Sequence, residues 1–347
     1  MVLTGRGGSC MTSGPPPFIV TRTPLRLSFA GGGTDLRAFY SMDHGAVVST
    51  SLDSFVYVTV KQHGPVFDER IRVNYSATET VGTVDEIQNN IARECLRLLE
   101  VDAPIYISVV SDLPESSGLG GSSSFTVGLL HALHRYRGES PTASELGEQA
   151  SRIEIEILRE PIGKQDQYAA AFGGMNLLRF CQDDSVSVES LPVTPTTLAR
   201  LFDHLVMFWT GSQRRASSVL GEQQERTGEH VPQLQAMRSH AYQVADLLRQ
   251  ETFDARAFGE VLDETWRLKR GLATAMTNMR IDSWYHAGRQ AGALGGKLCG
   301  AGGGGFLLFV APPERHDAIR SALPELRSVR VGYADQGSKV LLPADAS

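Results

Sequence analysis

Alternation of apolar and polar residues predicts the first strands of the fold. A large apolar residue stands at every second position over 25–29 and again over 105–109, as in a strand with one buried face. Further on, Phe125, Leu129 and Leu133 are spaced like one face of a helix. The chain between this second strand and this helix is rich in glycine and serine. We therefore expect a loop that leaves a strand and opens a helix.

The same patterns continue along the rest of the chain. Structure is expected to begin near Phe18, because residues 1–17 are rich in Gly, Ser and Pro and resemble a disordered leader. A length of 347 residues suggests two domains, for which we expect residues 18–195 and 196–347. The elements expected within them are helices over 36–40, 85–99 and 141–159, an antiparallel ribbon of two strands over 47–60, a strand over 205–209, several helices between 213 and 294, a strand over 306–310, a helix over 313–323 and two short strands ending at Leu342.

Charge and cysteine content narrow the class of protein. The net charge of −6 and the pI near 5.9 argue against nucleic acid or an anionic membrane as the main partner, and they leave room for a local basic pocket. The four cysteines show no Cys-x-x-Cys spacing and are expected to be reduced thiols of a cytoplasmic protein. No stretch of the sequence approaches the roughly 20 apolar residues of a membrane span, and the leader lacks the apolar run of a signal peptide.

The loop over 112–124 carries the strongest chemical pattern, Asp-Leu-Pro-Glu-Ser-Ser-Gly-Leu-Gly-Gly-Ser-Ser-Ser. Its glycines let the backbone approach a ligand, and the unpaired amides at the start of the following helix attract anions. The hydroxyls of Ser122, Ser123 and Ser124 suit contacts to phosphate or to a metal ion. The alternative is a tight turn with a serine cap. Because the loop contains no lysine, it is not the Gly-x-x-x-x-Gly-Lys-Ser/Thr loop of the common nucleotide hydrolases.

Carboxylates beside glycines and at helix ends are the other candidates for chemistry. The stretch Gly31-Gly32-Gly33-Thr34-Asp35 presents a carboxylate either as a cap for the next helix or as an acceptor for a polyhydroxylated ligand. Asp166 is expected at the start of a helix, either as an ordinary N-cap or as a carboxylate that the helix amides keep ionised. Glu154 and Glu156 stand near the end of the preceding helix, where the macrodipole disfavours acids that do not hold a cation.

A third glycine-rich segment, 295–305, precedes the strand over 306–310. Gly300, Gly302 and Gly305 formally match Gly-x-Gly-x-x-Gly. The expected order of helix, loop and strand is the reverse of what a dinucleotide-binding loop needs, so this match is rejected. The segment is instead expected to form a flexible backbone wall that closes on a ligand from the second domain.

Together, the segments 24–35, 114–124 and 296–305 resemble the three motifs of the GHMP small-molecule kinases, which include galactokinase and the homoserine, mevalonate and phosphomevalonate kinases. The resemblance follows the family's motif order and covers nearly the whole chain from residue 20. Within the family, the wording of these segments and of Pro161-Ile-Gly-Lys-Gln-Asp166-Gln is similar to D-glycero-α-D-manno-heptose 7-phosphate kinases. Galactokinase differs, because it has Gly-Glu-His-Thr-Asp where this chain has Gly-Gly-Gly-Thr-Asp.

The resemblance implies a two-domain α+β fold. Its N-terminal domain would be like the second domain of ribosomal protein S5, its C-terminal domain would be ferredoxin-like, and the active site would lie in the cleft between them. Asp166 falls on the family's catalytic aspartate, and Arg26 on the arginine that pairs with that carboxylate. Asp35 falls on the family's sugar-binding aspartate. Magnesium would be held by Ser122 and Glu154, with Glu156 as the alternative.

The family pattern also assigns residues to the two substrates. In the phosphate loop Gly121 replaces the first serine of the usual Gly-Leu-Gly-Ser-Ser-Ala-Ala. Cations for a distal substrate phosphate are not fixed by the pattern, and Lys164 or the pair Arg214-Arg215 could supply them. The residues expected to bind ATP are Pro114, Ser116, Ser117, Gly118, Leu119, Gly120, Gly121, Ser122, Ser123 and Ser124, and those expected to bind the sugar are Gly32, Gly33, Thr34, Asp35, Lys164, Arg215, Gly303 and Gly304.

The implied function is an ATP- and Mg²⁺-dependent sugar kinase. It would phosphorylate the anomeric hydroxyl of D-glycero-D-manno-heptose 7-phosphate to give the 1,7-bisphosphate, as a monomer or homodimer without nucleic-acid or membrane partners. Two alternatives remain open: a kinase for an unphosphorylated hexose such as galactose, fucose or mannose, and a non-catalytic sugar and nucleotide sensor on the same fold. Retention of Arg26, Ser122, Glu154 and Asp166 speaks against the sensor.

Overall fold

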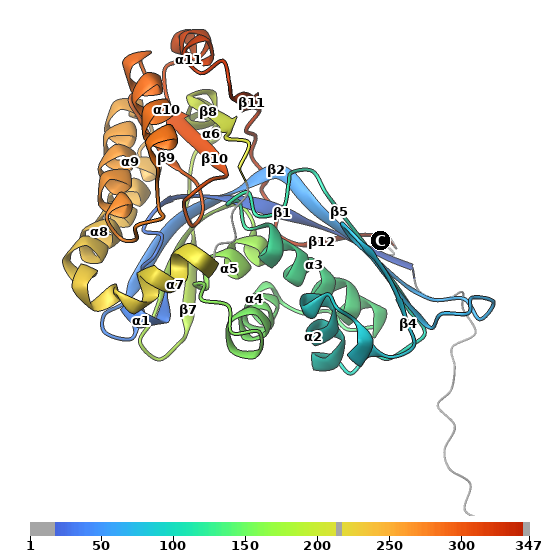
Figure 1. Cartoon of the computed structure of the whole chain (residues 1–347). Helices are drawn as coiled ribbons and strands as arrows, with labels where there is room; N and C mark the ends of the chain where they lie inside the picture. The colour runs from blue at the N-terminus through green and yellow to red at the C-terminus, as the bar shows by residue number, and fades with distance from the viewer. Residues whose placement is uncertain (1–17, 213–216, 343–347) are drawn as a thin grey trace, which may run out of the picture.

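The computed structural model describes residues 18–212 and 217–342, and the predicted leader over 1–17 lies outside them. Among the described residues the larger sheet has eight strands, with the long antiparallel neighbours β1 (Phe18–Ala30) and β2 (Gly45–Gln62) near its centre. Figure 1 shows this sheet curving across the molecule. Its other strands are β3 (Ile71–Asn74), β4 (Thr78–Val81), β5 (Ile105–Ser111), β6 (Met175–Phe180), β7 (Val186–Ser190) and β12 (Lys339–Leu342).

The predicted ribbon of two strands over 47–60 is wrong, because β2 is one continuous strand. Its first part, 45–50, pairs with β6, and its last part, 56–62, pairs with β5. The residues between these parts include no glycine or proline to make a tight turn. A shift of register against β1 between Pro24 and Arg26 accompanies the change of partner. The alternation therefore belonged to one strand that has different neighbours at its two ends.

Helices α2 to α5 cover one face of the large sheet (Figure 1). The central one, α3, packs against β1 and β2, and Leu129 and Leu133 from its predicted apolar face are fully buried. The helix predicted over 85–99 begins later, because the side chain of Asn89 caps α2 by accepting from the amide of Ala92. The helices of this half are α1 (Arg37–Tyr40), α2 (Asn90–Leu98), α3 (Gly121–Tyr136), α4 (Ala143–Ser151), α5 (Gln165–Phe172) and α6 (Pro195–Asp203).

The second sheet has the order β11-β8-β10-β9. In chain order these strands are the fourth, first, third and second, which is the ferredoxin-like arrangement that the resemblance implied. The loop expected from Gly295 is partly wrong, since its first residues form β9, antiparallel to β10. The elements of this half are β8 (Leu205–Trp209), α7 (Ser217–Glu225), α8 (Val231–Arg249), α9 (Ala255–Arg270), α10 (Met279–Gln290), β9 (Gly295–Leu298), β10 (Phe306–Val310), α11 (His316–Ala322) and β11 (Arg327–Val329).

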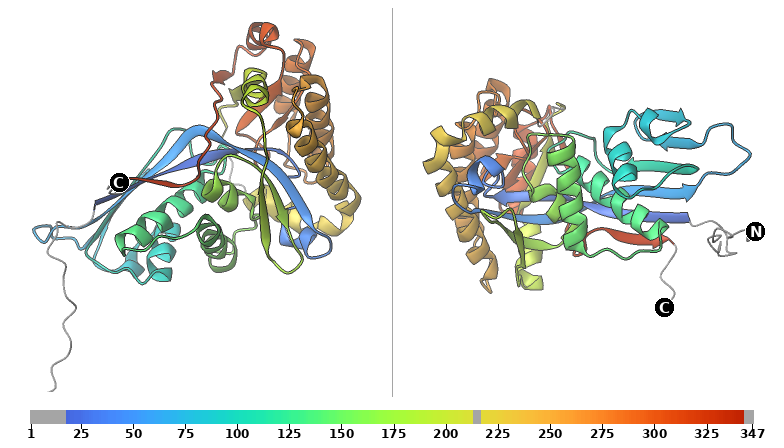
Figure 2. Two further views of the ribbon diagram at one scale, coloured as in Figure 1. Left: turned by 180° about the vertical axis from the view of Figure 1, so that it is seen from behind. Right: turned by 90° about the horizontal axis from the view of Figure 1, so that it is seen from below.

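The C-terminal segment of the chain connects the two halves. After β11 the chain runs back to the large sheet, where β12 lies antiparallel to β1 (Figure 2). Helix α8 also packs on β1 and β2. The division at residue 196 stays a prediction. None of the helices in the part of the chain that the structure describes combines the length and the hydropathy of a membrane span.

Candidate active site

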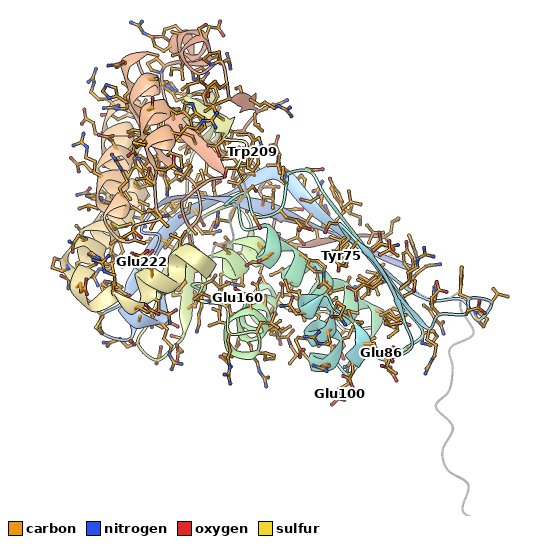
Figure 3. The ribbon with its side chains drawn as sticks, in the orientation of Figure 1. Tyr75, Glu86, Glu100, Glu160, Trp209 and Glu222 are labelled. Carbon is orange, nitrogen blue, oxygen red and sulfur yellow. The ribbon has the colours of Figure 1, made fainter. Side chains whose placement is uncertain are left out.

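A cavity of about 430 Å³ lies where the loop before α3 faces the loop after β9. The start of α5 lines it from the N-terminal half, and α7 and α9 line it from the C-terminal half. The three motifs, far apart in sequence, thus meet at one place. Figure 3 labels Glu160, which lines the cavity ahead of α5, and Glu222 on α7, the neighbour in sequence of the lining residue Gln223.

The predicted phosphate loop forms one wall of this cavity. Helix α3 begins at Gly121 behind the left-handed Gly120, with no side chain capping its first amides. Those free amides and the helix dipole make the loop suited to phosphate oxygens. Six of the ten residues expected to bind ATP line the cavity, namely Ser116, Ser117, Gly118, Gly120, Gly121 and Ser122.

The other four residues of that set do not line it. Pro114 is exposed, and the side chain of Leu119 is fully buried in the core. Ser123 donates to Glu154, and Ser124 donates to the carbonyl of Pro24 at 2.8 Å. The two serine side chains therefore support the start of the helix. Sequence spacing did not distinguish them from Ser122, which faces the cavity.

The two glycine-rich loops touch through their backbones. Gly118 has a φ of +83°, and a Cβ on it would lie 2.7 Å from the carbonyl oxygen of Cys299. A Cβ on Gly300 would lie 2.3 Å from the Cα of Gly118. Since real Cβ atoms do not approach this closely, both positions exclude any larger residue. The glycines thus allow the two halves to close tightly beside the cavity.

Arg26 and Asp166 form the pair that the resemblance implied. The guanidinium donates from Nε and Nη2 to the two carboxylate oxygens, each at 2.7 Å, and its Nη1 donates to the carbonyl of Gly118 at 2.7 Å. Arg26 is buried, whereas the side chain of Asp166 keeps 24% exposure and faces the cavity. This bidentate geometry fixes the carboxylate beside the phosphate loop.

Asp35 also lines the cavity, near the start of α5. Its carboxylate accepts from the amide of Gly33 at 2.8 Å and from that of Gln165 at 3.4 Å. Burial raises the pKa of this carboxyl group, and the nearby charge of Asp166 adds to the effect. Asp35 is therefore a desolvated acceptor of the kind that holds a hydroxyl group.

Some of the other residues expected to bind the sugar line the cavity, and some do not. Gly33 and Gly304 line the cavity. Thr34 does not, because its hydroxyl donates to the carbonyl of Gly31 at 2.7 Å and stabilises the glycine turn. Gly32 lies just behind the wall, with the ammonium of Lys269 4.0 Å from where its Cβ would stand. Gly303 instead donates from its amide to the carbonyl of Met276 at 2.8 Å.

The cations expected to bind a distal phosphate are not brought to the cavity. Lys164 lies over the ring of Tyr40 and donates to the carbonyl of Asp184 at 2.8 Å, and it does not line the cavity. Sequence placed it only two residues from Asp166, but the start of α5 turns the two side chains apart. Arg214 and Arg215 lie outside the described residues.

Glu154 and Ser122 stand together at the cavity wall. The buried carboxylate accepts from Ser122 Oγ and Ser123 Oγ, each at 2.7 Å, and from Gln167 Nε2 at 2.6 Å. Burial raises the pKa of Glu154, and these three donors partly offset the rise. Glu156, the alternative ligand, is exposed and does not line the cavity.

The local backbone explains why Glu154 faces inward. The helix predicted over 141–159 is α-helical only to Ser151 and continues as a π-helical turn over Arg152–Ile157. A π-turn widens the helix by one residue and rotates the side chains that follow, and such turns are frequent at functional sites. The donor set of one carboxylate and one hydroxyl fits Mg²⁺, which takes few protein ligands and completes its shell with water and phosphate oxygens.

Two buried lysines were missed by the sequence reasoning. Lys269 lines the cavity from α9, and burial lowers its pKa to about 8. Lys297 of β9 donates to the carbonyls of Ser28 at 2.7 Å and Phe29 at 3.1 Å. The sequence pattern did contain a signal that Lys269 is buried. Lys269 continues the apolar stripe of Phe258, Leu262 and Trp266, where a solvated lysine would not stand.

Lys297 predicts a pH-dependent stability. Burial lowers its pKa to about 7, whereas the unfolded chain keeps the ordinary value of 10.5. Between these values the unfolded state binds a proton that the folded state has lost, so this lysine makes the free energy of unfolding rise with pH. Urea unfolding from about pH 6 to about pH 9.5 should show wild type gaining stability relative to Lys297→Met. Lys339→Met, at an exposed position, serves as control. A difference in the free energy of unfolding between wild type and Lys297→Met that does not change with pH would contradict the assignment.

Comparison with known proteins agrees with this geometry. The N-terminal domain of the GHMP kinases matches residues 86–174, and their C-terminal domain matches residues 244–327. Fold, phosphate loop and matches together define a kinase that acts on an alcohol group of a small molecule. The chain belongs to the GHMP kinases.

Individual relatives differ in the acceptor that they are named for. The D-glycero-alpha-D-manno-heptose 7-phosphate kinase of Campylobacter jejuni is 28% identical over 324 residues, which cover 88% of this chain and 94% of that protein. The L-fucokinase/L-fucose-1-P guanylyltransferase of Bacteroides fragilis is 27% identical over 92% of this chain and 38% of that protein. The mevalonate kinase of Methanothermobacter thermautotrophicus is 26% identical over 86% of this chain and 90% of that protein.

Solved structures share the fold. A D-glycero-D-manno-heptose 1-phosphate kinase from Bacteroides thetaiotaomicron has a TM-score of 0.77 at 24% identity, over 93% of this chain and 98% of that one. Galactokinase of Lactococcus lactis in complex with galactose has a TM-score of 0.70 at 17% identity, over 93% of this chain and 95% of that one. At these identities the likeness concerns the fold, and the acceptor has to be argued from this chain's own residues.

Proposed function

We propose that this kinase transfers the γ-phosphate of ATP to the anomeric hydroxyl of D-glycero-D-manno-heptose 7-phosphate and so forms the 1,7-bisphosphate. The observation that carries the proposal is the Arg26–Asp166 pair, which holds a partly exposed carboxylate between the phosphate loop and Asp35. The name of the 28% identical Campylobacter relative supports this acceptor. ATP and a sugar phosphate as substrates also favour a cytoplasmic enzyme.

In the proposed reaction the protein supplies position and charge. Phosphates of ATP bind the free amides at the start of α3, and the sugar binds with its anomeric hydroxyl at Asp166. As the hydroxyl oxygen bonds to the γ-phosphorus, the bond from that phosphorus to the bridging oxygen breaks and ADP leaves. Asp166 accepts the hydroxyl proton, and Arg26 balances negative charge on the carboxylate and the phosphoryl group.

Ser122 and Glu154 are the residues that would hold Mg²⁺. Their oxygens lie side by side at the cavity wall, 2.7 Å apart, and both are hard ligands. When bound, the ion would neutralise charge on the ATP phosphates. The three donors around Glu154 orient its carboxylate in advance, because each of its oxygens already accepts at least one hydrogen bond.

An unphosphorylated hexose is the second candidate acceptor. Of the described residues that line the cavity, the cations are Arg26 and Lys269, and Arg26 is committed to Asp166. Lys269 donates to the carbonyl of Gly300 within the same wall. The described lining thus offers few groups for a distal phosphate. A phosphate at C7 would have to draw on cations such as Arg214 and Arg215, outside the described residues.

The two acceptors are separated by one assay. ADP release would be measured with Mg-ATP against D-glycero-D-manno-heptose 7-phosphate, the free heptose, galactose, fucose, mannose and mevalonate. We expect kcat/KM to favour the heptose 7-phosphate on the order of 10²-fold or more, because in the proposed function cations outside the described lining bind the distal phosphate and the free heptose would leave them unpaired. Phosphorus NMR should place the new phosphate at C1. Turnover confined to a free hexose would replace the proposed acceptor, and ATP binding without turnover of any acceptor would overturn the kinase assignment.

A further inference from the structure

Helix α7 places an unpaired polar side chain at the cavity. Gln223 is only 1% exposed, it lines the cavity, and neither its Oε1 nor its Nε2 has a hydrogen-bond partner within the described residues. A buried amide that forms no hydrogen bonds loses its hydration without compensation, and such groups are rare in folded proteins. Sequence patterns gave no reason to single out Gln223.

The neighbours of Gln223 hold it in this position. The adjacent residue, Glu222, is labelled on α7 in Figure 3. Its carboxylate accepts from the amide of Thr274 at 2.9 Å and from the hydroxyl of Thr274 at 2.8 Å, which fixes α7 to the segment after α9. The carboxamide packs against Gly33, where a Cβ would lie 2.5 Å from Nε2. Gly33 in turn donates its amide to Asp35 at 2.8 Å. Gln223 therefore faces the same glycine turn that positions Asp35.

Further unpaired polar atoms gather behind this turn. Oγ of Ser28 and Oε1 of Gln165 are both buried without hydrogen-bond partners among the described residues. The position that a Cβ of Gly32 would take lies 3.7 Å from Gln165 Nε2, 3.8 Å from Ser28 Oγ and 4.0 Å from Lys269 Nζ. Gln165 lines the cavity, so its Oε1 adds an unsatisfied acceptor beside the glycine turn that Gln223 faces, and Ser28 lies behind that turn. A polar ligand with many hydroxyl groups matches that surface.

We propose that Gln223 is a specificity-determining residue, whose carboxamide binds two neighbouring hydroxyl groups of the acceptor sugar from α7. A carboxamide offers one acceptor and two donors in a plane, so Oε1 can accept from one hydroxyl while Nε2 donates to the oxygen of the next. This inference rests on the proposed function, in which the acceptor is a polyhydroxylated sugar. It assigns to the C-terminal half a direct part in choosing that sugar.

The test compares Gln223→Met with Gln224→Met. Methionine keeps the length of the side chain and removes both hydrogen-bonding groups, and Gln224 is the next residue on α7 with an exposed side chain. For Gln223→Met we expect the KM for the sugar to rise about 10- to 100-fold, with the KM for ATP within about twofold of wild type. Gln224→Met should leave both values unchanged. An unchanged KM for the sugar in Gln223→Met would mean that water satisfies the amide and would overturn the proposal.

Deoxy analogues make the test specific for hydrogen bonding. Wild type should discriminate against the analogue that lacks a bound hydroxyl by about 10-fold or more, and Gln223→Met should lose that discrimination, as in a double-mutant cycle. Equal discrimination by both proteins for every ring hydroxyl would contradict the role. Thermal denaturation gives a second readout: at the same sugar concentration the sugar should stabilise wild type more than Gln223→Met, whereas Mg-ATP should stabilise both equally.

Failure of this inference is distinguishable from failure of the proposed function. The wild-type assay first identifies the acceptor, and the variants are then measured with whichever sugar is turned over. If Gln223→Met does not fold, Gln223→Glu keeps the shape and the acceptor oxygens but cannot donate. It should retain part of the sugar affinity if Nε2 and Oε1 both contribute, and a KM equal to wild type would again overturn the role.

Discussion

Asp166→Asn is expected to lower kcat by about 10²- to 10⁴-fold while ATP still binds. The amide keeps the shape of the side chain but cannot accept a proton, and it presents an NH₂ group to a guanidinium that now donates to both oxygens at 2.7 Å. The loop amides that would hold the ATP phosphates belong to α3 and are not changed. Steady-state kinetics give kcat, and calorimetric titration with a non-hydrolysable ATP analogue gives the nucleotide affinity.

Asp317→Asn provides the control for this substitution. Its side chain is 95% exposed and pairs only with Arg320 among the ion pairs of the described residues, so turnover should equal that of wild type. Near-normal turnover in Asp166→Asn would rule out proton transfer to this carboxylate. In that case the Arg26–Asp166 pair would be a structural link between β1 and α5, and the base would have to be sought elsewhere in the cavity.

The sequence predicted the site best where backbone chemistry requires a particular residue. The run Gly118-Leu-Gly120 before α3 could be recognised because a loop that exposes helix amides needs glycine there. Pairing of Arg26 with Asp166 followed from the family resemblance, although 140 residues separate them in the chain. Such features can be recognised in a sequence because few other residue types can take their place.

Residues whose role depends on tertiary packing were not predictable. Lys164 stands two positions from Asp166, yet the packing of α5 sends it to Asp184. Gln223 and Lys269 come from helices of the other half and reach the cavity only because the two halves close on each other. The long strand β2 was missed for a related reason, since periodicity does not show that a strand changes its neighbours along its length.

The contact between the glycine loops links the fold to the chemistry. Gly118 supplies the carbonyl that orients Arg26, and it also meets Gly300 at a distance that excludes side chains. The carbonyl of Gly300 in turn accepts from Lys269 at the cavity wall. The position of the loop before α3, the orientation of the Arg26–Asp166 pair and the closure of the C-terminal half therefore depend on the same backbone contact. A kinase needs these to be set together, because phosphoryl transfer relies on alignment of its two substrates.

Glu154→Gln is expected to reduce kcat/KM for Mg-ATP on the order of 10²-fold and to raise the Mg²⁺ concentration needed for half-maximal rate by at least about 10-fold. The substitution removes the negative charge that a divalent cation requires. It also places an amide NH₂ among three donors that now converge on the carboxylate, from Ser122, Ser123 and Gln167. Rates would be measured across a Mg²⁺ titration at fixed ATP, and a thermal unfolding curve would check that the variant is folded.

Glu156→Gln is the matched control, because it makes the same change two residues away on an exposed side chain. It should leave the Mg²⁺ dependence unchanged. The opposite result, a shifted Mg²⁺ dependence in Glu156→Gln and a normal one in Glu154→Gln, would move the metal site out of the cavity. A loss of rate in Glu154→Gln without any change in Mg²⁺ dependence would instead make Glu154 a support for Ser122 at the start of α3. Burial raises the pKa of Glu154, and a desolvated carboxylate gains most from a bound cation. Burial therefore favours the expected result, a higher Mg²⁺ requirement in Glu154→Gln.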